Sequence, residues 1–267
     1  MINIDQITNS CKEIVDAQKE IYLKGASITN HNKIPDSSQI PIRNQNHWIK
    51  IPNVICVYVD MVNSTRLSAT RHDKSTASTY QLFTGTAVRL FHEFYASYID
   101  VRGDGVFALF DSDKPHIALA SAVTFKTFSE EEFVPTLKSK VEVDIGCHVG
   151  IDQKTLLVKK IGLQRIKDRT DRQNEVWAGK PVNMASKLAS KGTHGELIVS
   201  DRFFNAIKCE EALYSCGCPN EEKVYLWESV DLSDDANFDF KEAYLLRSKW
   251  CKDHGREYCE KVIEFDQ

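Results

Sequence analysis

Two aspartates in matched settings carry the strongest chemical signal in the sequence. Asp60 ends the apolar run VICVYVD and precedes the polar segment MVNSTRL, whereas Asp104 separates two apolar runs in VRGDGVFALF. Two carboxylates at the ends of adjacent strands suit divalent cations that also contact substrate phosphates. This arrangement favours phosphoryl or nucleotidyl chemistry. Each aspartate alone has a simpler interpretation, because Asp60 could cap a helix and Asp104 could serve a turn.

The elements predicted around these aspartates alternate between strand and helix. Apolar and β-branched runs predict strands at residues 54–59, 99–101, 106–110, 141–151, 197–199 and 224–227. Helical spacing of apolar residues predicts helices at 5–24, 75–96, 116–128 and 180–190. The central order of strand, helix, hairpin, helix and strand is typical of a ferredoxin-like α+β fold, with helices packed on an antiparallel sheet.

Length and composition limit the classes of protein. The chain has 267 residues, is 42% hydrophobic and carries a net charge of −4, so it suits a large core and gives no indication of nucleic-acid or membrane partners. No apolar run reaches the ~20 residues of a membrane helix, and the polar N-terminus does not resemble a signal peptide. We therefore expect a cytoplasmic protein. We divide it into an N-terminal helix and linker arm (1–49), a catalytic domain (50–230) and a C-terminal helical extension (231–267).

Eight cysteines raise the question of disulfides or metal ligands. The size of the chain and the absence of a signal peptide argue against disulfides. A C-terminal group could hold zinc, and it consists of Cys216, Cys218, Cys251, His254 and Cys259. Its spacing matches no standard pair of CxxC ligands, so the sequence does not favour a metal site there.

Three ordered segments, VYVDMVNSTRL, VRGDGVFALF and VWAGKPVNMASKLAS, resemble the signature segments of class III nucleotidyl cyclases. The resemblance covers about residues 50–200. It implies a ferredoxin-like catalytic domain that works as a homodimer, with active sites at the subunit interface. It also implies that Asp60, Asp104 and the backbone carbonyl of Met61 bind two divalent metal ions, Mn²⁺ or Mg²⁺.

The same resemblance assigns roles around the triphosphate. Asn63, Ser64 and Thr65 match the turn whose backbone N–H groups bind phosphate oxygens. Asn183 matches the asparagine that orients the ribose. Lys187 lies where the family usually has arginine, and lysine keeps the positive charge but loses the bidentate fork. The spacing of four residues puts Asn183 and Lys187 on one helix face, although each could be an ordinary helix residue.

The residues that would contact the base depart from the adenylyl and guanylyl patterns. Asp100 lies four residues before Asp104, where adenylyl cyclases typically have lysine and guanylyl cyclases glutamate, and Arg102 shares its strand face. The segment VWAGKPVNMASK resembles the pyrimidine cyclases of bacterial anti-phage (Pycsar) systems. In such a protein Trp177 would narrow the base pocket, or it could simply belong to the core. Asp100 could accept a hydrogen bond from cytosine N4, whereas uridylate production is the commoner activity among the resembling proteins, so UTP and CTP both stay open.

The resemblance therefore implies an enzyme, a phosphorus–oxygen lyase that converts UTP or CTP to the 3′,5′-cyclic nucleotide and pyrophosphate. The product would be a second messenger, read by a separate effector protein in anti-phage defence. Three alternatives stay open. These are an adenylyl or guanylyl cyclase with atypical base contacts, a non-catalytic nucleotide-binding sensor of the same fold, and a di-metal phosphohydrolase, which would be expected to show His-rich metal motifs.

Overall fold

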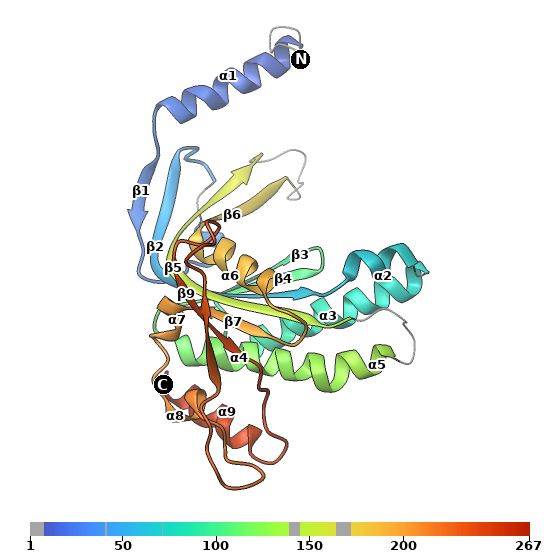
Figure 1. Cartoon of the computed structure of the whole chain (residues 1–267). Helices are drawn as coiled ribbons and strands as arrows, with labels where there is room; N and C mark the ends of the chain where they lie inside the picture. The colour runs from blue at the N-terminus through green and yellow to red at the C-terminus, as the bar shows by residue number, and fades with distance from the viewer. Residues whose placement is uncertain (1–7, 41, 71, 139–144, 164–171) are drawn as a thin grey trace. The chain divides into compact units, whose positions relative to one another are not determined.

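The computed structural model describes residues 8–40, 42–70, 72–138, 145–163 and 172–267 (Figure 1). Internal contacts divide the chain into two compact units. The arm unit consists of residues 1–51 and 156–178, and the core unit consists of residues 52–155 and 179–267.

The core unit is built on a mainly antiparallel sheet. Its strands are β2 (His47–Met61), β3 (Tyr98–Arg102), β4 (Gly105–Phe110), β5 (Cys147–Gly162), β7 (Leu197–Ser200), β8 (Trp227–Asp231) and β9 (Glu242–Leu246), of which β2 and β5 continue into the arm unit. The strand order is β3-β4-β2-β5-β7-β9-β8. The β5–β7 pair is parallel, whereas β2–β4, β3–β4, β7–β9 and β8–β9 are antiparallel. The predicted α+β class, with helices on an antiparallel sheet, is confirmed.

Helices cover both faces of this sheet. They are α2 (Ser64–Thr70), α3 (Asp73–Glu93), α4 (Pro115–Phe128), α5 (Val134–Lys138), α6 (Lys180–Lys191), α7 (Asp201–Phe204), α8 (Glu210–Leu213) and α9 (Gly255–Glu264), with a π-helical turn at Ser129–Phe133. Phe83 of α3 and Phe125 of α4 are fully buried and meet edge to face, with ring centroids 5.1 Å apart. Such aromatic pairs add to the stability gained by burying apolar area.

Helix α6 lies on the opposite face of the sheet from α3 and α4. Leu197 and Val199 of β7 face the large core that contains Phe83, whereas Ile198 between them packs with Leu188 of α6. A Cβ atom on Gly150 of β5 would lie 2.0 Å from the carbonyl oxygen of Ala185. The backbone of α6 therefore rests directly on β5, and only glycine allows this approach.

Helix α9 docks on α4 through the aspartate that follows it. The Asp266 carboxylate accepts a hydrogen bond of 2.7 Å from the backbone N–H of Ile117, in the first turn of α4, and contacts Nδ1 of His116 at 2.7 Å. The backbone N–H of Lys208 donates to Nε2 of His116 at 3.1 Å. Because Nε2 accepts, a neutral His116 carries its proton on Nδ1 and donates it to Asp266. This network satisfies one of the orphan N–H groups of α4.

The arm unit combines a helix with short strands. Helix α1 spans Asn9–Leu23, and β1 (Ser27–Asn30) pairs in parallel with the first part of β2, so the segment expected to be a linker contains a strand. Strand β6 (Gln173–Gly179) pairs with β5. Across the described ranges, none of the helices has the length and apolar character that crossing a bilayer requires.

Candidate active site

The two aspartates lie on neighbouring strands of the core unit. Val59 of β2 pairs with Val106 of β4, so Asp60 comes opposite Gly105, and Asp104 precedes Gly105 in the turn from β3 to β4. A Cβ atom on Gly105 would lie 3.2 Å from Oδ1 of Asp60 and 2.3 Å from the hydroxyl oxygen of Tyr58. The structure thus brings Asp60 and Asp104 together, and the absence of a side chain at residue 105 makes room for Asp60.

The electrostatics of this pair fit a divalent cation. The pKa of Asp60 is raised from 3.8 to about 6, mainly by burial and also by the negative charge of Asp104, whereas a hydrogen bond with the backbone of Met61 opposes both effects. Without a cation, the two carboxylates repel each other at a half-buried position. A divalent ion with oxygen ligands would relieve this repulsion, and the main-chain carbonyl of Met61 adds a third candidate ligand next to Asp60.

The turn after Asp60 leads into helix α2. Asn63 adopts a left-handed conformation with φ of 59°, which asparagine tolerates better than most residues. Its carbonyl accepts a hydrogen bond of 3.0 Å from the N–H of Leu67, and Val62 donates to the carbonyl of Gly146 at 3.0 Å. Ser64 is buried at the first position of α2, and Thr65 is exposed.

Helix α6 contacts β2 through the residue between the two predicted catalytic positions. Ser186 forms a side-chain hydrogen bond with the hydroxyl of Tyr58. Asn183 and Lys187 are both exposed on this helix. The ammonium group of Lys187 donates to the backbone carbonyl of Asn237 at 2.8 Å. Lys187 is therefore positioned by a segment that the sequence did not connect with α6.

That segment, residues 235–239, is called the strap. It forms ion pairs with two further lysines of α6. Lys180 pairs with Asp239 at 2.7 Å, and Lys191 pairs with Asp235 at 3.2 Å. The strap therefore meets Lys180 and Lys191 with carboxylates, whereas it meets the lysine between them with a neutral carbonyl. The strap lies about 50 positions downstream of α6, and no sequence pattern links it to the helix.

Asp100 and Arg102, the two residues expected to contact the nucleobase, form an ion pair with each other. Asp100 and Arg102 share a face of β3, and Nη2 of Arg102 lies 2.6 Å from Oδ2 of Asp100. The Arg102 side chain is 57% exposed and the Asp100 side chain 21%, so the guanidinium keeps donors available to a ligand. Trp177 lies in β6 and is buried, and its role at a base stays a prediction.

The chain is similar to curated proteins over most of its length. No known protein-family profile matches the chain. A curated protein named uridylate cyclase from Propioniciclava tarda is 37% identical over 232 residues, which are 85% of this chain and 74% of that protein. A second protein with this name, from Micromonospora echinofusca, is 37% identical over 262 residues, which are 93% and 81% of the two chains.

Solved cyclases share the fold at low sequence identity. The adenylyl cyclase CyaB from P. aeruginosa superimposes with a TM-score of 0.59 at 13% identity, over 76% of this chain and 96% of that one. The guanylate cyclase domain of RhGC from Catenaria anguillulae, in complex with GTP, gives a TM-score of 0.58 at 15% identity, over 75% and 98%. The ferredoxin-like cyclase fold expected from the three motifs is therefore confirmed.

Proposed function

The chain belongs to the class III nucleotidyl cyclases, together with its uridylate cyclase relatives, and from this premise we propose that it converts UTP to 3′,5′-cyclic UMP and pyrophosphate. The observation that carries the proposal is the pair of carboxylates, Asp60 at the end of β2 and Asp104 in the turn before the neighbouring strand β4, beside the Asn63 turn. The names of the two relatives favour UTP, and CTP is the alternative substrate.

In this reaction the ribose 3′-oxygen forms a bond to the α-phosphorus, and the bond from that phosphorus to the α–β bridging oxygen breaks. The electron pair leaves with pyrophosphate, and the proton of the 3′-hydroxyl passes to solvent. Asp60, Asp104 and the Met61 carbonyl would hold the divalent ions, which when bound activate the 3′-hydroxyl and neutralise the triphosphate. Backbone N–H groups of Asn63, Ser64 and Thr65 would bind phosphate oxygens.

We propose further that Asn183 and Lys187 act in the active site of a second copy of the chain. Both are exposed on α6, as residues that complete a site across an interface must be. Asn183 would orient the ribose, and Lys187 would stabilise the negative charge that develops on the α-phosphate. An ammonium group has three N–H donors, so Lys187 can keep its bond to Asn237 while it donates to a phosphate oxygen.

The Asp100–Arg102 pair supports a pyrimidine substrate. Uracil presents an N3–H donor between two carbonyl acceptors. A carboxylate that is held beside a guanidinium offers an acceptor next to donors, and uracil needs both kinds of partner at this edge. Asp100 would accept from N3–H, and Arg102 would donate to a neighbouring carbonyl.

The test is to incubate purified protein with Mn²⁺ and each of the four nucleoside triphosphates, and to identify products by mass spectrometry. We expect cyclic UMP from UTP, and its loss in Asp60→Ala and Asp104→Ala variants that stay folded. Asp113→Ala is the matched control, because Asp113 is an exposed aspartate after β4 and should keep activity. Cyclic product from ATP or GTP alone would contradict the pyrimidine assignment, and no cyclic product would refute the activity.

A role in anti-phage defence is a further proposal. It would require that cyclic UMP appears in cells during infection and activates a separate effector protein. The measurement is the cyclic UMP content of infected cells that carry the wild-type chain or the Asp104→Ala variant. Equal amounts in both would contradict the signalling role.

A further inference from the structure

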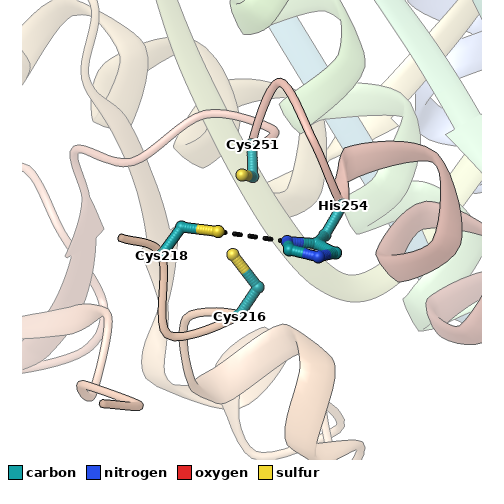
Figure 2. A group of neighbouring side chains, drawn as sticks. All are labelled: Cys216, Cys218, Cys251 and His254. Atoms are coloured by element: carbon teal, nitrogen blue, oxygen red, sulfur yellow. Dashed lines mark hydrogen bonds between the residues drawn. The ribbon is translucent and has the colours of Figure 1, made fainter. Parts of the chain in front are cut away.

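Three cysteines and one histidine from distant parts of the core unit converge on one point (Figure 2). Cys216 and Cys218 come from the loop after α8, and Cys251 and His254 come from the segment that leads into α9. One sulfur or nitrogen atom from each residue lies within 4.8 Å of the other three. Sγ of Cys218 is 3.1 Å from Nδ1 of His254. The three cysteines are free thiols.

The conformation of the loop after α8 directs the sulfurs of Cys216 and Cys218 towards this point. Gly217 lies between Cys216 and Cys218 with φ of 90°, a conformation that favours glycine. The hydroxyl of Ser215 accepts hydrogen bonds from the N–H groups of Gly217, at 3.3 Å, and of Val224, at 3.0 Å. These bonds fold the loop back on itself before any ligand arrives.

The second pair of ligands is fixed from the other side. The backbone N–H groups of Asp253 and His254 donate hydrogen bonds to Sγ of Cys251. The N–H of Gly255 donates to the Cys251 carbonyl at 2.8 Å, which closes the turn before α9. Trp250 anchors this turn to α4, because its indole N–H donates to Thr124 at 2.9 Å. N–H groups directed at a sulfur stabilise the thiolate, which is the form of cysteine that binds metal.

We propose that Cys216, Cys218, Cys251 and His254 bind one zinc ion in a closed structural site. Three sulfurs and one imidazole nitrogen are a ligand set typical of structural zinc. A tetrahedral ion with Zn–S bonds of about 2.3 Å sets its ligand atoms about 3.8 Å apart. The separations of 3.1 Å and up to 4.8 Å bracket this value, so small side-chain movements suffice. Four protein ligands fill a tetrahedral shell and leave no position for a substrate.

Two features of the sequence kept this site from being predicted. The ligand pairs are spaced C-x-C and C-x-x-H, with 32 residues between Cys218 and Cys251, and neither pair is a CxxC motif. Cys259 was grouped with them, but it lies within α9 and packs against the main core. The site consists of the other four residues of that group. The zinc ion would tie the loop after α8 to the start of α9, the helix that Asp266 docks on α4.

The experiment uses the full chain, purified under reducing conditions from cells grown with zinc, and counts metal per chain by mass spectrometry. We expect about one zinc per chain after removal of loosely bound ions, and its loss in Cys218→Ser and Cys251→Ser. Cys259→Ser is the matched control and should keep its zinc. Replacing zinc by Co²⁺ in the wild-type protein should give the visible and sulfur-to-metal absorption of a tetrahedral thiolate site, which carboxylate ligands such as Asp60 cannot produce.

The cobalt spectrum tests the wild-type protein directly, so the proposal does not depend on whether a cysteine variant folds. Absence of both zinc and the sulfur-to-cobalt band would overturn it, as would equal zinc contents in the wild-type and Cys218→Ser proteins. A mass two hydrogens lower under non-reducing conditions, with no metal, would show that two of the cysteines form a disulfide instead, and this also overturns it. None of these results depends on cyclase activity.

Discussion

Replacing Asp60 by asparagine should have opposite effects on stability with and without a metal ion. The substitution keeps the shape of the side chain and removes its charge. In the folded protein the pKa of Asp60 is about 6, above the ordinary value of 3.8, because the carboxyl is partly buried beside Asp104. A pKa that is raised by folding means that stability is greatest when the group is protonated and is lost as the pH rises through about 6.

The size of the effect follows from that difference. At 1.36 kcal/mol per pKa unit, the change from 3.8 to about 6 corresponds to about 3 kcal/mol. Asp60 is only half-buried, so water screens part of this energy, and we expect about 1–2 kcal/mol. Metal-free Asp60→Asn should therefore be more stable than the wild type by this amount at pH 8. The advantage should shrink as the pH falls from 6 towards 4, where wild-type Asp60 becomes neutral in the folded state.

Saturating Mn²⁺ should reverse the order. An ion that binds only the folded state at 100 times its Kd adds about 2.7 kcal/mol, and asparagine removes the charge that holds it. The assay is urea unfolding at pH 8, with chelator or with Mn²⁺, and both proteins receive the same treatment so that the cysteine cluster is in the same state. Asp113→Asn is the control, because Asp113 is an exposed aspartate, and its stability should match the wild type with chelator and with Mn²⁺. The reasoning is refuted if metal-free Asp60→Asn is less stable than wild type at pH 8, or if Mn²⁺ stabilises both proteins equally.

Three further predictions concern single contacts. Gly105→Ala would place a Cβ atom 2.3 Å from the Tyr58 hydroxyl, so we expect at least a tenfold loss of cyclase activity and about 1–3 kcal/mol lower stability in urea unfolding; unchanged activity would contradict the tight packing. Asp266→Asn should lower the unfolding free energy by about 1–3 kcal/mol, because it weakens the charge-assisted hydrogen bonds of Asp266 with His116 and Ile117 at the start of α4. An unchanged urea midpoint would contradict this stabilising role of Asp266. Lys187→Ala should lower kcat by at least tenfold with little change in stability, whereas Lys187→Arg should retain most activity; equal rates in all three proteins would remove Lys187 from the catalytic site.

Elements with a strong local signal were predictable from the sequence. The apolar run before Asp60 and the spacing of apolar residues in α3 specify a strand and a helix without reference to the rest of the chain. The Asp60–Asp104 pair was also predictable, because the turn before Gly105 is local and adjacent strands bring their ends together. Strand β1 was missed, since its four residues are all exposed and pair only with β2.

Features that depend on distant partners could not be predicted in the same way. The strap reaches α6 only because β9 folds back beside β7, and the Asp100–Arg102 ion pair depends on side-chain conformers that no spacing rule gives. The cysteine cluster forms because Trp250 fixes the start of α9 on α4. Each residue type was visible in the sequence, but its partner was determined by tertiary contacts.

The direct contact between α6 and β5 restricts how this protein can change during evolution. At Gly150 there is no room for a single methyl group, because the carbonyl of Ala185 occupies the space. Substitution there would push α6 off the sheet and carry Asn183 and Lys187 with it. Among cyclases of this lineage, glycine at this position should therefore persist for as long as catalysis is under selection. Replacement of this glycine in a related protein would indicate loss of catalytic activity, even where both metal-binding aspartates are retained.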